Sequence, residues 1–211
     1  WVNCGGGMGG RINPLQVKDV PTDDEEEEAI LFKDEGNGMG ALALHFQTLR
    51  TFFKLYLKDL NDIDQATLEE VLEERYEKLS LLLRRSAVGA DSALWNGHTT
   101  IEAKADFIVL DTHDLQEADD TIKRTQYFNI LTWAWQQLSK DREERVLLGV
   151  DEAYLVVDPE VPQALQFLRN VSKRIRKYMG GLAVITHSVV DFLDPSVRRH
   201  GQSLLDNPYG S

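Results

Sequence analysis

The chain has 211 residues, 42% of them hydrophobic and 27% charged, a composition typical of a globular protein with one sizeable core or a core and a small appendage. Its net charge of -12 argues against a surface built broadly to neutralise nucleic-acid phosphates, while a local basic patch stays compatible with it. The single cysteine, Cys4, excludes an intrachain disulfide, and no Cys/His set has the spacing of a zinc site, which favours a reducing, cytosolic setting.

No apolar run approaches the roughly 18 residues of a membrane span, and the first residues do not read as a signal peptide. We therefore expect a chain that neither crosses nor enters a membrane by itself. Because it begins at Trp1, in what reads as the middle of structure, we expect it to be part of a longer protein.

The first forty residues read as connecting structure. A short strand at Trp1–Cys4 is predicted to run into a glycine turn at Gly5–Gly10, followed by an extended segment ending in Pro14-Leu15. Six consecutive acids, Asp23–Glu28, repel one another and favour a solvated loop over an acidic docking site.

Two amphipathic helices are predicted next. Apolar residues recur at three- and four-residue steps over residues 41–57, and again over residues 66–79, where five glutamates coat the opposite face. Together they predict a small all-helical lobe.

From residue 107 onward the pattern changes to strands alternating with helices. The apolar runs Phe107–Leu110, Val146–Val150 and Leu182–Ile185 predict buried strands of a parallel sheet. Helical periodicity is found between them, over about 118–139 and 162–178. Strand, helix, strand, helix, strand is the βαβ pattern, so the sequence predicts an α/β fold.

Two acidic residues, Asp151 and Glu152, follow directly after the run Val146–Val150. Open α/β sheets bind their ligands at the carboxyl ends of the strands. In a nucleotide-hydrolysing site the first acid would hold the magnesium shell, and the second would orient or polarise the attacking water. Taken alone, the pattern favours a plain strand-terminating acidic loop over a catalytic site.

A second polar segment, Thr186-His187-Ser188, ends the next predicted strand and is expected beside the acids at the same sheet edge. His187 would there be placed to contact a γ-phosphate. A capping or surface histidine is the competing interpretation.

Basic residues line the helix between these two strands, opposite its apolar face. Three interpretations stay open: solvated charge, which is the default, a phosphate or nucleic-acid contact, or an arginine supplied to the nucleotide of a neighbouring subunit. The residues are Arg169, Lys173, Arg174, Arg176 and Lys177.

The segment Gly5–Gly10 resembles the phosphate-binding pattern G-x-x-x-x-G-K-[ST] only superficially. Arg11 stands where the lysine would reach the phosphates, and Ile12 has no hydroxyl for magnesium. We interpret the segment as a glycine turn and find no Walker A motif in the chain.

Five segments, each a weak signal alone, are jointly specific: Gly10–Gln16, Asp151–Tyr154, Arg174–Tyr178, Gly181–Ser188 and Gly201–Asn207. They resemble the large cytoplasmic VirB-type ATPase of type IV secretion and conjugal transfer, in the HerA/FtsK branch of P-loop motors. The resemblance covers nearly the whole chain, and Leu94–Thr99 and Ile108–Asp111 look like the versions carried by Gram-positive conjugative elements.

The resemblance implies a RecA-like P-loop NTPase core, a mostly parallel sheet flanked by helices, formed by residues 1–40 and 90–211, with a small helical insertion at 41–89. It implies a ring-shaped homo-oligomer, a hexamer, that couples hydrolysis of ATP with Mg²⁺ to assembly of the secretion apparatus or to DNA or protein transfer. Asp151 and Glu152 would be Walker B, with Asp151 holding Mg²⁺ through water. His187 would be the sensor, and Arg174 or Arg176 would contact nucleotide in trans.

The resemblance also implies a cytoplasmic protein that is peripheral to the cell membrane through its partners, the other type IV secretion components at the inner face, with contact to DNA as an option. The chain departs from the family in its absent P-loop, an insertion shortened near Leu79–Leu81, and an end before the family's last strand. We expect the chain alone to be a poor or inactive ATPase. The alternative is a non-catalytic interaction or DNA-contacting module of the same machinery.

Overall fold

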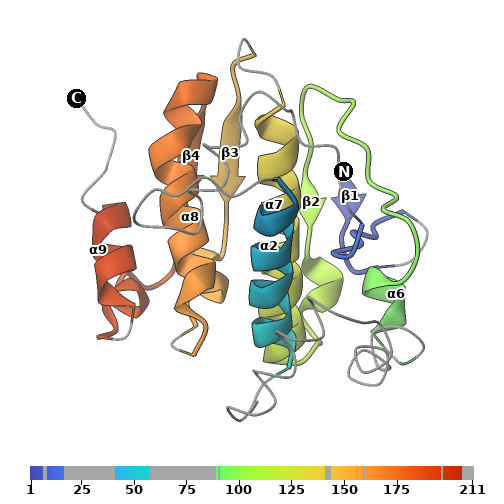
Figure 1. Ribbon diagram of the computed structural model, residues 1–211, viewed down its shortest axis with the longest axis horizontal. Coiled ribbons are helices and arrows are strands. Elements are labelled where there is room, and N and C mark those ends of the chain that lie inside the picture. The colour runs from blue at the N-terminus through green and yellow to red at the C-terminus, as the bar shows by residue number, and fades with distance from the viewer. Residues whose placement is uncertain are drawn as a thin grey trace. The chain divides into compact units, whose positions relative to one another are not determined.

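The computed structural model describes residues 1–6, 9–16, 41–57, 89, 91–140, 144–158, 160–195 and 197–205, which form an α/β fold with short parallel strands. Contacts divide the chain into two units, unit 1 with Trp1–Asp19 and His45–Trp133, and unit 2 with Val20–Leu44 and Ala134–Ser211. The elements in chain order are β1 (Val2–Asn3), α2 (Ala41–Tyr56), α6 (Ser92–Trp95), β2 (Leu110–Asp111), η3 (His113–Leu115), α7 (Asp120–Leu138), β3 (Leu147–Val150), η4 (Ala153–Val156), α8 (Pro162–Arg174), η5 (Ile175–Tyr178), β4 (Gly181–Val184), η6 (Val190–Leu193) and α9 (Arg198–Leu205) (Figure 1).

Unit 1 contains the parallel pair β1–β2, in which Val2 lies opposite Leu110. The pairing continues past the strand end, because the Cys4 amide donates to the Asp111 carbonyl at 2.7 Å. The Asp111 carboxylate accepts the His113 amide at 2.9 Å and the Trp1 indole at 2.8 Å. These two hydrogen bonds, the His113 amide first, hold the pKa of Asp111 below its usual value because they favour the charged form.

Buried polar side chains join α6 and α7 to the start of the chain. The Gln126 side chain accepts the Trp95 indole N–H at 2.7 Å and donates to the Cys4 carbonyl at 2.9 Å. One turn further along α7, the Asn129 amide donates to the Ile12 carbonyl at 2.9 Å. Because buried backbone carbonyls need partners, these two amide side chains fix the path of the segment that follows β1.

The segment Gly10–Gln16 pairs with the loop that follows α6. Thr100 donates its amide to the Arg11 carbonyl at 3.0 Å, and its hydroxyl accepts the Arg11 amide at 3.0 Å. Two segments that carry the family resemblance are therefore each other's partners in the fold. The remaining bonds run from Asn13 N to Thr99 Oγ1 (3.1 Å), from Asn13 Nδ2 to Gly97 O (2.8 Å) and from Thr99 N to Gln16 Oε1 (2.9 Å).

Helix α2 confirms the amphipathic helix predicted at 41–57. In unit 1 its aromatic face packs on Trp95, with ring centroids 5.1 Å from Phe52 and 4.8 Å from Tyr56, and the Tyr56 hydroxyl donates to Asp91 at 2.7 Å. The helix predicted at 66–79 lies outside the described residues. The helical subdomain at 41–89 therefore stays a prediction.

Unit 2 contains the second parallel pair, β3–β4, in register from Leu147 opposite Gly181 to Val150 opposite Val184. Helix α8 connects the two strands, which confirms the predicted βαβ order in this unit. Helix α9 lies beside α8 (Figure 1) and meets η6 at Gly201, where a Cβ would collide with the Phe192 carbonyl. A glycine is therefore required at this contact.

The helix predicted at about 162–178 is confirmed in its extent, but its last turn tightens into the 3-10 helix η5. Met179 follows with φ 49°, and the Gly180 amide bonds back to the Ile175 carbonyl at 2.9 Å. This left-handed ending satisfies the last carbonyls and reverses the chain into β4 within two residues.

The apolar runs are less buried than predicted. Strand β2 covers only Leu110–Asp111, and Phe107, expected in that strand, is 82% exposed. In unit 2, Val184 is 38% and Ile185 is 56% exposed. Each described sheet has only two strands, and in unit 2 the described residues leave one face of the β3–β4 pair partly uncovered.

We predict that Gly10→Ala destabilises unit 1, because the new Cβ would overlap the Asn3 carbonyl. Overpacking against backbone should lower the free energy of unfolding by roughly 3 kcal/mol, measured by urea denaturation. Gly9→Ala is the matched control, since a Cβ there meets nothing within 4 Å. Equal midpoints for the two variants would contradict the close approach.

We also predict that the Cys4 thiol is inert in the native protein. Burial, and secondarily the Asp111 carboxylate, raise its pKa to about 12 from 9.0, so at pH 8 the thiolate fraction falls about a thousandfold. Alkylation should be slow under native conditions and fast in urea. Because Cys4 is the only cysteine, mass spectrometry of the whole chain reads it directly, and native labelling as fast as in urea would contradict the burial.

Candidate functional site

The two acids predicted from the sequence lie at the carboxyl end of β3. Asp151 is exposed and follows Val150, which is 2% exposed. The Asp151 Oδ1 accepts the Glu152 amide at 2.8 Å, and Oδ2 has no hydrogen-bond partner among the described residues. Asp151 thus offers one carboxylate oxygen to solvent while the other orients the next peptide.

Glu152 has a left-handed backbone, with φ 52° and ψ 38°. Residues other than glycine adopt this backbone conformation at a cost of about 1 kcal/mol or more, and residues strained in this way concentrate at functional sites. The turn lets the fully buried Ala153 donate its amide to the Ile185 carbonyl at 3.0 Å, while Ile185 donates to Val150 at 2.8 Å. The segment that carries the acids is thereby tied to the end of β4.

The polar segment after β4 lies at this same edge. Thr186 and Ser188 close a small turn, in which the Thr186 hydroxyl lies 3.4 Å from the Ser188 amide and 3.3 Å from its carbonyl. The exposed His187 ring lies 6.3 Å from the Tyr154 ring, centroid to centroid. The structure therefore brings Asp151, Glu152 and His187 to one sheet edge, as the sequence predicts, while their chemical roles stay predictions.

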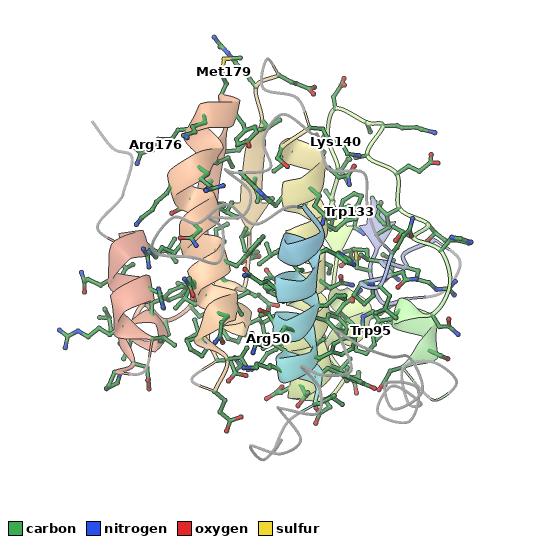
Figure 2. All side chains as sticks on the ribbon, in the orientation of Figure 1. Arg50, Trp95, Trp133, Lys140, Arg176 and Met179 are labelled. Atoms are coloured by element: carbon green, nitrogen blue, oxygen red, sulfur yellow. The ribbon has the colours of Figure 1, made fainter. Side chains whose placement is uncertain are left out.

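The two candidate trans-acting arginines lie at the opposite end of unit 2. Arg174 ends α8 and is half-buried, and Arg176 is exposed in η5, before β4 begins (Figure 2). A four-residue strand separates them from the acidic edge, about 13 Å at 3.3 Å per residue. The structure does not bring them together with Asp151, so a contact with nucleotide would have to be made to another subunit.

Arg169 was predicted in the exposed basic strip, and this is wrong. It is 7% exposed, and its Nη1 lies 2.8 Å from the His200 Nδ1 on α9. Because a guanidinium only donates hydrogen bonds, the His200 Nδ1 must accept this one, which requires the neutral imidazole tautomer that carries its proton on Nε2. Helical periodicity could not reveal this pair, since α9 covers a side of α8 that reads as solvent-facing in the sequence.

The described part of Gly5–Gly10 fits a glycine turn rather than a phosphate loop. Gly6 has φ +96°, and Gly10 packs on the Asn3 carbonyl. The Arg11 guanidinium lies over α6, with Nε 3.4 Å from the Ala93 carbonyl.

In the described residues no helix is long and apolar enough to cross a bilayer.

No family model matches the sequence, and no curated protein matches it. Among solved structures, the chain is similar to VirB4 of Thermoanaerobacter pseudethanolicus, with a TM-score of 0.82 and 47% sequence identity. The match covers 99% of this chain and 62% of that one, so the chain spans less than two thirds of the length of VirB4. Over nearly all of its own length the chain is similar to this VirB4 in sequence and in fold, which bears out the resemblance predicted from its motifs.

Proposed function

We propose that the chain is part of the motor of a type IV secretion ATPase. The observation that carries this proposal is the parallel pairing of β3 and β4, which sets Asp151, Glu152 and His187 at one sheet edge in a VirB4-type fold. Open α/β sheets place their ligands at this edge. The phosphate-binding loop is then supplied by a part of the protein outside this chain.

The acids fit a nucleotide site that uses magnesium. Mg²⁺ prefers oxygen ligands, keeps several of its waters, and when bound to ATP neutralises charge on the phosphate oxygens. Asp151 presents a solvent-exposed oxygen, Oδ2, that is suited to hold one of those waters. We assign Asp151 the metal shell on this ground.

We assign to Glu152 the role of orienting or polarising the attacking water. Its carboxylate is half-buried and has no hydrogen-bond or ion-pair partner among the described residues, so its lone pairs are available to a water molecule. A positioned carboxylate that accepts a proton in the transition state contributes about 10²- to 10⁴-fold to a rate. To His187, at the neighbouring strand end, we assign a hydrogen bond donated to the γ-phosphate.

Arg174 or Arg176 completes the site of an adjacent subunit. Their distance from the acids of their own chain supports action in trans, which requires a homo-oligomeric ring, as in motors whose arginine stabilises the transition state on a neighbour's nucleotide. In the full-length protein, hydrolysis drives assembly of the secretion apparatus or transfer of DNA or protein. Partners at the inner face of the membrane hold this cytoplasmic motor in place.

The alternative is a module that binds partners or DNA without hydrolysis. With Arg169 buried, the exposed basic residues of the strip are reduced to Lys173, Arg176 and Lys177. Set against a net charge of -12, these three leave a smaller cationic surface than the sequence predicted. The motor proposal is therefore preferred.

We predict that Glu152→Gln in the full-length protein abolishes ATP turnover, with a loss of about 10²-fold or more, while ATP binding is retained. Phosphate release and equilibrium binding of a fluorescent ATP analogue measure the two properties separately. Glu144→Gln is the matched control, because Glu144 is an exposed glutamate of the same unit that precedes β3, at the other end of the strand from Glu152. No turnover in the wild type, or turnover indifferent to Glu152, would favour the interaction module.

Mixing two inactive variants tests the arginine in trans. Arg176→Ala and Glu152→Gln should each abolish turnover, but rings assembled from equal amounts of both should recover about a quarter of wild-type turnover, because one interface in four joins an intact Glu152 to an intact Arg176. Arg174→Ala is tested in the same way, and Lys173→Ala serves as the control. Failure of both arginine variants to complement would contradict action across subunits.

A further inference from the structure

The His187 side chain lacks a hydrogen bond that would fix it. Its ring is exposed, and among the described residues no donor or acceptor pairs with either ring nitrogen. The turn bonds beside it involve the Thr186 hydroxyl and the Ser188 backbone only. A side chain meant to reach a phosphate needs a defined orientation, so another contact has to supply it.

The aromatic ring of Tyr154 supplies such a contact. The two ring centroids are 6.3 Å apart and the planes are inclined by 45°. This separation is within the 4.5 to 7 Å range, roughly, over which aromatic rings attract one another. Tyr154 is half-buried, so its ring forms one wall beside an imidazole that is otherwise open to solvent.

The backbone around Tyr154 is held on both sides. Its carbonyl accepts the Val157 amide at 2.9 Å, and the Leu155 amide bonds back to the Glu152 carbonyl at 3.0 Å. The preceding residue, Ala153, is fully buried, and its amide donates a hydrogen bond to the carbonyl of Ile185, which directly follows β4. The ring therefore extends from a fixed turn that begins at Glu152, with its centroid 6.3 Å from that of the His187 ring after β4.

We propose that Tyr154 is a positioning residue that orients the His187 imidazole toward the nucleotide, coupling the acidic turn after β3 to the sensor after β4. This inference rests on the proposed function of the same edge. The tyrosine hydroxyl has no hydrogen-bond partner among the described residues. The aromatic ring, rather than the hydroxyl, therefore orients the His187 imidazole. Tyr154→Phe keeps the ring and should keep His187 oriented, whereas Tyr154→Leu removes the ring and should leave His187 without a fixed orientation.

A double-mutant cycle in the full-length protein tests the proposal. Tyr154→Leu should lower kcat for ATP about two- to tenfold, the range that corresponds to one aromatic contact, with KM changed less than twofold. Tyr154→Phe should match the wild type. In a His187→Ala background, Tyr154→Leu should cause no further loss, because the residue through which it acts is gone. Melting temperatures of all variants control for a general loss of stability.

The cycle separates failure of this inference from failure of the motor proposal. If the wild type turns over and Glu152→Gln does not, but Tyr154→Leu equals the wild type or lowers kcat equally in both backgrounds, the positioning role is overturned and the motor proposal stands. If the wild type does not turn over ATP at all, both are overturned.

Nuclear magnetic resonance reads the contact without turnover. In the chain labelled at its five histidines, the His187 side-chain signal is identified by its loss in His187→Gln. That signal should move by more than its line width in Tyr154→Leu and stay in place in Tyr154→Phe, because only the first variant removes the ring. A His187 signal that is the same in all Tyr154 variants would overturn the proposal.

Discussion

The candidate site depends on the register between β3 and β4. Because Val150 lies opposite Val184, both strands end at the same level, and the hydrogen bonds from Ile185 to Val150 and from Ala153 to Ile185 extend the pairing beyond them. A slip of one residue would exchange the faces to which the side chains point and would separate Glu152 from the histidine turn. The chemistry proposed for this edge is thus a consequence of backbone pairing between two strands of four residues each.

The sequence predicts this edge well because its signals are local. An apolar run followed by Asp151-Glu152, and another followed by the histidine turn, specify two strand ends, and the helix between them requires a parallel crossover. The left-handed backbone of Glu152 was not predictable, since no local residue preference demands it. Arg169 was misplaced for a related reason: its neighbour His200 is 31 positions away, and only tertiary packing brings them together.

Unit 1 shows that resemblance to a family does not always mark chemistry. The segment Gly10–Gln16 carries part of the family resemblance, yet its backbone is occupied by the loop after α6 and by Asn129. Gly10 has to be glycine because it lies against the Asn3 carbonyl. These residues therefore define how the start of the chain is bound into the fold.

At Glu152 the residue that would best fit the left-handed backbone differs from the residue that the proposed chemistry needs. Glycine is the residue that relaxes such a backbone, so it is the replacement that selection for stability alone would favour. A glycine would also remove the carboxylate to which we assign the attacking water. A screen of this protein for thermal tolerance should therefore enrich Glu152→Gly. That single substitution would raise the free energy of unfolding and lower the rate of hydrolysis.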